Sequence, residues 1–209
     1  MTRQSDPHDD QRKRRKSRDS QLGRKTELRT PRLRLLVVCG AEVTEHTYVQ
    51  GLKNAARNPA VSIKIVKYPK APSQVVAHTV KLLEAADDAY DEAWCVLDVD
   101  EFTDIDQALR EADRNHIGIA LSNPCFEVWL LLHFTNHRKH APSYDQLVPI
   151  LNKYTPGGYS KTDLDFRHYE DGWREAVRRA RLLAPDGKER EVNPSTGMWK
   201  LALAIGGPQ

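Results

Sequence analysis

Residues 93–100 read AWCVLDVD, a short apolar run that ends in two aspartates, Asp98 and Asp100. A continuous apolar run is typical of a parallel strand buried on both faces, and ligands of α/β sheets bind just beyond the carboxyl ends of such strands. Side chains alternate along a strand, so both aspartates point to the same side and can reach one hard cation such as Mg²⁺. The pattern also fits a strand that simply meets a polar loop, so a second observation is needed.

A second apolar run, LRLLVVC at residues 33–39, leads through Gly40 into a helical pattern. Gly40 permits the turn, Thr44 is a suitable N-cap, and the apolar residues that follow recur at helical spacing. Glu42 and Glu45 therefore lie in or just after a strand-to-helix turn, which brings them to the same sheet edge as the two aspartates. Glu45 taken alone also fits the ordinary preference for acidic residues in the first helical turn.

Extended and helical patterns alternate along the chain beyond the first 30 residues. The predicted strands cover residues 33–38, 61–67, 93–98 and 117–121, and the predicted helices cover 44–57, 73–89, 104–115, 143–153, 170–183 and 195–205. Such alternation predicts an α/β fold in which helices cover both faces of a parallel sheet. With 209 residues, 39% of them apolar, the chain can bury one main core. We therefore expect one α/β domain over residues 31–209, with a helical C-terminal part.

A buried helix is predicted after Asn123, a suitable N-cap that places Pro124 at the first helical position. Residues 128–132 are apolar on every side, which is typical of a helix inside the core. Glu127 then lies in the first turn of that helix, where a lone carboxylate is costly unless it meets a cation, a hydrogen-bond network or a metal ion. A glutamate that offsets the helix dipole at the edge of the core explains the position equally.

Positive charge is concentrated at the start of the chain, where residues 1–34 hold 12 Lys and Arg against 5 Asp and Glu. Large apolar side chains are nearly absent from this part, so we expect a disordered basic tail over residues 1–30. A basic arm suits DNA or RNA because each neutralised phosphate releases counterions, although a merely solubilising tail has the same composition. The expected nucleic-acid contacts are Arg12, Lys13, Arg14, Arg15, Lys16 and Arg18.

No apolar run approaches the roughly 20 residues that span a bilayer, and the charged N-terminus is unlike a signal peptide, so we expect a cytoplasmic protein without membrane contact. The cysteines are widely spaced in apolar surroundings, which predicts core positions rather than disulfides or a zinc cluster. They are Cys39, Cys95 and Cys125. Three nearby histidines lack a cysteine or carboxylate companion, which favours a surface cluster over a zinc site. They are His133, His137 and His140.

Four blocks of the sequence, in order, resemble those of the RloB family. Residues 38–45, VCGAEVTE, resemble its C-E-G-E-x-T-E opening, and residues 97–102, LDVDEF, resemble its D-x-D-E segment. Residues 122–134, SNPCFEVWLLLHF, resemble its S-N-P-x-F-E-x-W-L-L-L-H block, and residues 193–196, NPST, resemble its N-P-S-T block. The match spans about residues 33–205, and four ordered blocks are far more specific than one motif.

The resemblance implies a Toprim-like α/β domain that carries out Mg²⁺- or Mn²⁺-dependent phosphodiester cleavage. It further implies an endonuclease effector of anti-phage defence, linked to restriction or abortive-infection loci and working with an ATPase partner. The chain has no G-x-x-x-x-G-K-[ST] phosphate loop, so energy coupling needs that partner. The positions carried over as catalytic are Glu42, Glu45, Asp98 and Asp100. The metal-binding positions are Glu45, Asp98 and Asp100, with Glu101 and Glu127 as further candidates.

The chain departs from the family pattern at Gly40 and Ala41, where the family has Glu-Gly. The glutamate that the resemblance implies at the end of the first strand, as a metal ligand or general acid–base, is therefore missing. Either Glu42 or Glu45 substitutes for it, or the protein is a catalytically impaired module that binds nucleic acid or an ATPase. In the first case, one or two Mg²⁺ held by Glu45 and the two aspartates would polarise the scissile phosphate, with Glu42 as a base or outer-shell ligand.

Overall fold

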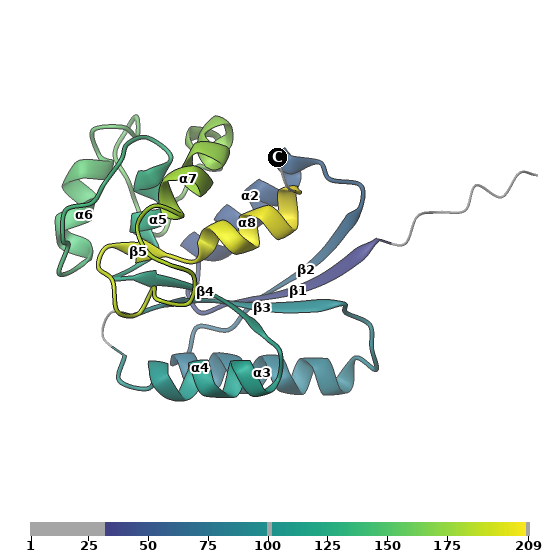
Figure 1. The fold of residues 1–209 in the computed structure, drawn as a ribbon. Coiled ribbons are helices and arrows are strands. Elements are labelled where there is room, and N and C mark those ends of the chain that lie inside the picture. The colour runs from purple at the N-terminus through teal and green to yellow at the C-terminus, as the bar shows by residue number, and fades with distance from the viewer. Residues whose placement is uncertain (1–31, 100–101, 208–209) are drawn as a thin grey trace, which may run out of the picture. The chain divides into compact units, whose positions relative to one another are not determined.

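A five-stranded sheet forms the centre of the structure, a computed structural model that describes residues 32–99 and 102–207 (Figure 1). Its strands are β1 (Leu33–Cys39), β2 (Val61–Lys67), β3 (Glu92–Asp98), β4 (Gly118–Asn123) and β5 (Ser195–Thr196). They are arranged in the order β2-β1-β3-β4-β5, and all neighbours are parallel except the pair of β4 and β5. The α/β fold with a parallel sheet, expected from the sequence, is confirmed.

The basic tail predicted over residues 1–30, with its six expected nucleic-acid contacts, lies outside the described residues. Asp100 and Glu101 lie outside them as well. Of the predicted site residues, the structure describes Glu42, Glu45, Asp98 and Glu127.

Helices cover both faces of the sheet, as Figure 1 shows. On one face are α3 (Pro72–Ala85) and α4 (Ile105–Arg114). The other face carries α2 (Thr44–Ala56), α5 (Glu127–Leu132), α6 (Tyr144–Leu151), α7 (Trp173–Ala180) and α8 (Met198–Gly206). Two short 3-10 helices, Phe166–His168 and Glu170–Gly172, precede α7.

The side-chain alternation of β1 divides the core between these two layers. Leu35, Val37 and Cys39 pack into the larger cluster beneath α2, α5 and α8, whereas Leu36 and Val38 pack against α3 and α4. All five side chains are at most 1% exposed, as expected of a central strand buried on both sides. The cysteines predicted to be core residues are buried and free, which confirms that prediction.

The predicted start of the buried helix at Asn123 is wrong. Asn123 is the last residue of β4 and pairs with Ser195 of β5. Its side-chain amide donates to the backbone oxygens of Glu189 and Arg190, so the residue belongs to the sheet and does not cap a helix. The helix begins instead at Glu127, which keeps this carboxylate in the first turn.

Other boundaries differ for similar reasons. Thr44 is the first residue of α2, not its N-cap, and its hydroxyl donates to the backbone oxygen of Lys161. The helix predicted over residues 195–205 begins at Met198, because Ser195 and Thr196 form β5. The helix predicted over residues 170–183 is shorter as well and runs from Trp173 to Ala180.

The prediction of a surface histidine cluster is wrong for His133, which is 5% exposed. Its Nδ1 lies 2.9 Å from the carbonyl oxygen of Trp129 and therefore donates, so Nε2 accepts from the hydroxyl of Tyr48 at 2.9 Å. Burial lowers the pKa of His133 to about 3. This histidine is a neutral core residue that ties α2 to α5.

Candidate functional site

The candidate site lies where the chain changes direction across the sheet. From β1 the chain passes to β2 on one side, then crosses to β3 on the other side of β1. A crevice between strands whose connections leave in opposite directions is where α/β sheets bind ligands. Cys39 at the end of β1 pairs with Val96, two residues before Asp98, so both strands end at the same edge. The turn into α2 and the first turn of α5 meet this edge.

Glu45, in the first turn of α2, is 1% exposed. Its Oε2 accepts a hydrogen bond from the backbone N–H of Ala41 at 2.8 Å, which fixes the carboxylate against the turn that follows β1. Burial raises the pKa of Glu45 to about 8, the negative charge of Glu127 adds to this, and the Ala41 N–H and the ammonium of Lys161 oppose it. Without a further cation, Glu45 is therefore largely protonated at neutral pH.

Glu127 is also 1% exposed and faces the same place from α5. Its Oε1 accepts a 2.6 Å hydrogen bond from the hydroxyl of Tyr159 and lies 3.9 Å from Nζ of Lys161. Its Oε2 is buried and has no hydrogen-bond partner within the described part of the chain. A buried carboxylate oxygen in that state carries a desolvation cost that a bound cation can relieve.

Asp98, the last residue of β3, belongs to the same cluster and is only partly exposed. The pKa of the Cys125 thiol is raised by burial and further by the negative charges of Glu127 and Asp98. Burial lowers the pKa of Lys161, but the negative charge of Glu127, with a smaller contribution from Asp98, outweighs this effect and leaves the pKa raised. The pKa values of Cys125 and Lys161, which belong to different segments, are thus both affected by Glu127 and Asp98.

Two residues of the site were not found by sequence reasoning, Tyr159 and Lys161. Both come from the loop after α6, and the loop is fastened to α2 by the 2.8 Å hydrogen bond from the Thr44 hydroxyl to the Lys161 carbonyl. Nζ of Lys161 lies 3.8 Å from the centroid of the Tyr144 ring, a cation–π contact. The one signal in the sequence is a lysine beside a glycine pair, GGYSK at residues 157–161, and it is weak.

The structure does not bring every predicted residue into the cluster. Glu42 is exposed in the turn before α2, unlike the buried Glu45 and Glu127. Asp100 and Glu101 fall outside the described residues. At Gly40 the backbone N–H donates to the carbonyl oxygen of Val96 at 3.0 Å, and an added Cβ would lie 3.1 Å from that oxygen. A side chain at position 40 therefore requires a small shift of β3.

The donor set suits a hard divalent cation. Over residues 32–99 and 102–207, no three His, Cys, Asp or Glu side chains stand together as a ready metal-binding group. Mg²⁺ is commonly held by only one or two carboxylates, with water completing its shell. Glu45 and Glu127 would supply oxygen ligands, and a cation would relieve the desolvation of Oε2 of Glu127, which has no hydrogen-bond partner among the described residues. The residues present therefore fit a Mg²⁺ or Mn²⁺ ion that retains several waters.

Within the described residues, no helix is long and apolar enough to cross a membrane. Fold and site together define an α/β protein with a buried acidic cluster at the carboxyl edge of its parallel strands. The family model for RloB-like proteins matches residues 35–205, and the chain belongs to the RloB family. No curated protein and no solved structure gives a significant match.

Proposed function

We propose that the protein is a Mg²⁺- or Mn²⁺-dependent nuclease that hydrolyses phosphodiester bonds. The observation that supports this most is the pair of buried carboxylates Glu45 and Glu127, with Asp98 ending β3 at the same sheet edge and one oxygen of Glu127 buried without a hydrogen-bond partner among the described residues. Buried carboxylates that share one place are costly unless a cation neutralises them. An acidic pocket of this kind has the chemistry of a site for a hard metal ion.

Each residue of the cluster has a role in this proposal. Glu45, Asp98 and Glu127 would hold the metal ion, with Asp100 and Glu101, which follow β3 in the sequence, as further proposed ligands. When bound, the ion supplies Lewis acidity to the scissile phosphate and lowers the pKa of a bound water. The Ala41 N–H and the Tyr159 hydroxyl orient Glu45 and Glu127. The ammonium of Lys161 would contribute positive charge where the phosphate binds, and Glu42 is proposed as a base or outer-shell ligand.

The biological setting is proposed from the family. We propose that the nuclease is an effector of anti-phage defence in the cytoplasm and that an ATPase partner supplies energy coupling. Nucleic acid, DNA or RNA, is its proposed substrate, and the basic segment over residues 1–30 is proposed to raise affinity for it through counterion release.

Replacing Asp98 with Asn tests the metal-dependent reaction. We expect Asp98→Asn to weaken Mn²⁺ binding about tenfold or more and to slow cleavage of plasmid DNA or tRNA at least as much. Titration calorimetry measures the binding, and gel assays with and without EDTA measure the cleavage. Glu84→Gln, on the exposed face of α3, is the matched control, because it removes one carboxylate charge far from the site. Equal Mn²⁺ affinity in wild type and Asp98→Asn would contradict the assignment.

Gly40 favours a second candidate function, a binding module without hydrolysis. The glutamate expected from the family pattern is absent here, and its Cβ would press on the Val96 carbonyl oxygen at 3.1 Å. The test compares Gly40→Glu with Gly40→Ala, each combined with Ala41→Gly, because both variants carry the same crowded Cβ and differ only in the carboxylate.

If the protein is already a nuclease, wild type cleaves and the restored carboxylate gives at least the rate of the alanine control. If wild type and the alanine control are inert on plasmid DNA and tRNA while the glutamate variant cleaves, the binding module is the natural function. Glu42→Gln in the wild-type background tests whether Glu42 replaces the glutamate that is absent at position 40. If this variant loses cleavage, Glu42 has taken over the role of that glutamate.

A further inference from the structure

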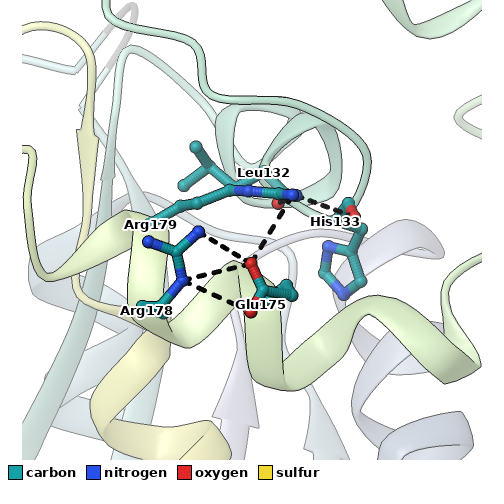
Figure 2. Close-up of polar contacts among 5 residues, drawn as sticks. All are labelled: Leu132, His133, Glu175, Arg178 and Arg179. Carbon is teal, nitrogen blue, oxygen red and sulfur yellow. Dashed lines mark hydrogen bonds and ion pairs between the residues drawn. The ribbon is translucent and has the colours of Figure 1, made fainter.

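The arginines on α7 and just after it differ in what they contact. Two of them form hydrogen bonds or ion pairs within the protein. Arg179 donates from Nη1 to the backbone oxygens of Leu132 at 2.6 Å and His133 at 2.9 Å, which satisfies carbonyls at the end of α5. Arg178 forms a two-pronged ion pair with Glu175, with its shortest contact at 2.8 Å. Figure 2 shows both arginines turned toward Glu175, with Arg179 reaching on to the end of α5.

Arg174 and Arg181 instead lie against indole rings. Neither forms an ion pair with any residue in the described ranges 32–99 and 102–207. The guanidinium of Arg174 lies 4.3 Å from the ring centroid of Trp173, and that of Arg181 lies 5.4 Å from the ring centroid of Trp199. Stacking on an indole holds a guanidinium in place without using its N–H donors. Both side chains therefore keep donors for an anion from outside.

These two arginines line one cavity of about 360 Å³, together with Val177, Arg178 and Leu182. The lining residues lie on α7 and at the two positions after it, 181 and 182, and they recur at intervals of three or four residues, so they share one face. Leu182 is 54% exposed and adds apolar surface to the cavity. The cavity thus combines free guanidinium groups with an exposed apolar surface, and we name it the α7 groove.

We propose that the α7 groove binds single-stranded nucleic acid, with phosphates at Arg174 and Arg181 and an unstacked base against Leu182. Seven residues separate the two arginines, about 10.5 Å along a helix, so they contact different phosphates of one strand. A duplex stacks its base faces internally and offers the groove phosphates alone, whereas a single strand offers both chemistries. An acidic peptide would supply negative charges for the two arginines. It has no flat base beside each charge that could pack against Leu182.

The position of α7 connects this groove with the acidic cluster. Glu127 lies in the first turn of α5, and Arg179 of α7 holds the other end of the same helix. Because α5 has six residues, only about 9 Å of helix separates the two ends. α7 is thus fastened to the helix that carries Glu127, and under the proposal a strand bound in the α7 groove would run toward the nuclease site. The inference extends the proposed function, but binding in EDTA succeeds or fails independently of cleavage.

The test removes the two uncommitted arginines from the full-length protein. Arg174→Gln with Arg181→Gln is compared with Arg110→Gln plus Arg114→Gln on α4. The control removes the same charge from the opposite face of the sheet, where Arg114 has only a loose 3.6 Å ion pair. Fluorescence anisotropy in EDTA measures binding of a labelled oligothymidylate of about 20 nucleotides over a range of salt concentrations.

We expect the groove variant to bind the oligonucleotide at least about fivefold more weakly and to reduce the salt slope by about 1.4, two contacts at 0.7 each. The α4 control changes affinity less than twofold. Equal losses in both variants would reduce the effect to net charge and overturn the proposal. A larger loss for a duplex of the same length, or a loss seen only with a poly-glutamate probe, would also overturn it. Unchanged melting temperatures establish that both variants are folded.

Discussion

Glu127→Gln is expected to slow metal-dependent cleavage about 100-fold or more, the largest loss of activity that we predict for one substitution. The variant keeps an oxygen for the 2.6 Å hydrogen bond from Tyr159, so the side chain stays in place. It loses the negative charge beside the buried Oε2, the atom that most needs a cation. The measurement is the cleavage rate of plasmid DNA or tRNA over a Mg²⁺ titration.

Tyr159→Phe separates ligation from orientation. This variant leaves the carboxylate charge intact and removes the hydroxyl that positions it, so we expect a loss of about tenfold. Glu84→Gln on α3 again serves as the control for charge alone. A rate for Glu127→Gln within twofold of the wild type, at every Mg²⁺ concentration, would show that Glu127 is a structural residue of the core.

The sheet was predictable because its strands are encoded locally. β1 and β3 are short apolar runs bounded by polar or glycine residues, and the predicted bounds differ from the observed ones by one residue. β5 was not predictable, because two residues have no periodicity. Thr196 is held in the sheet by distant partners, including the hydroxyl of Ser122 at 2.9 Å, 74 residues away. The same pairing explains the wrong assignment of Asn123 as a helix cap.

The candidate site likewise contains residues that the local sequence predicts and residues that it does not. Asp98 ends one predicted strand and Glu45 lies just beyond another, so the rule for the carboxyl edge of parallel strands is enough to predict that they share an edge. Lys161 reaches the site through a loop, and its contact with Thr44 spans 117 residues. Nothing in the residues near Lys161 encodes that contact. The sequence also predicted a role for Glu42, which the structure leaves exposed and apart from the buried cluster.

The burial of Glu45 predicts an unusual pH dependence of stability. Its pKa is about 8 in the folded protein and lies near the ordinary 4.5 in the unfolded chain. Between these values the folded state binds a proton that the unfolded state does not, so the free energy of unfolding falls as pH rises from 4.5 through 8. Glu45→Gln removes this loss. In EDTA at about pH 8.5, we expect it to stabilise the protein by on the order of 2 kcal/mol, or about 5 °C in Tm.

The stabilising effect of Glu45→Gln has to depend on both pH and metal. At about pH 5, where wild-type Glu45 is protonated when folded, we expect the two melting temperatures to converge. Saturating Mn²⁺ at about pH 8.5 reverses the order, because the ion stabilises only the protein that retains the carboxylate. Glu42→Gln, on the exposed side of the same turn, is the control and leaves the melting temperature unchanged at either pH. A difference in melting temperature between Glu45→Gln and wild type that stays constant across this pH range would mean that Glu45 is ionised in the folded protein. The buried acidic cluster would then need another source of neutralising charge.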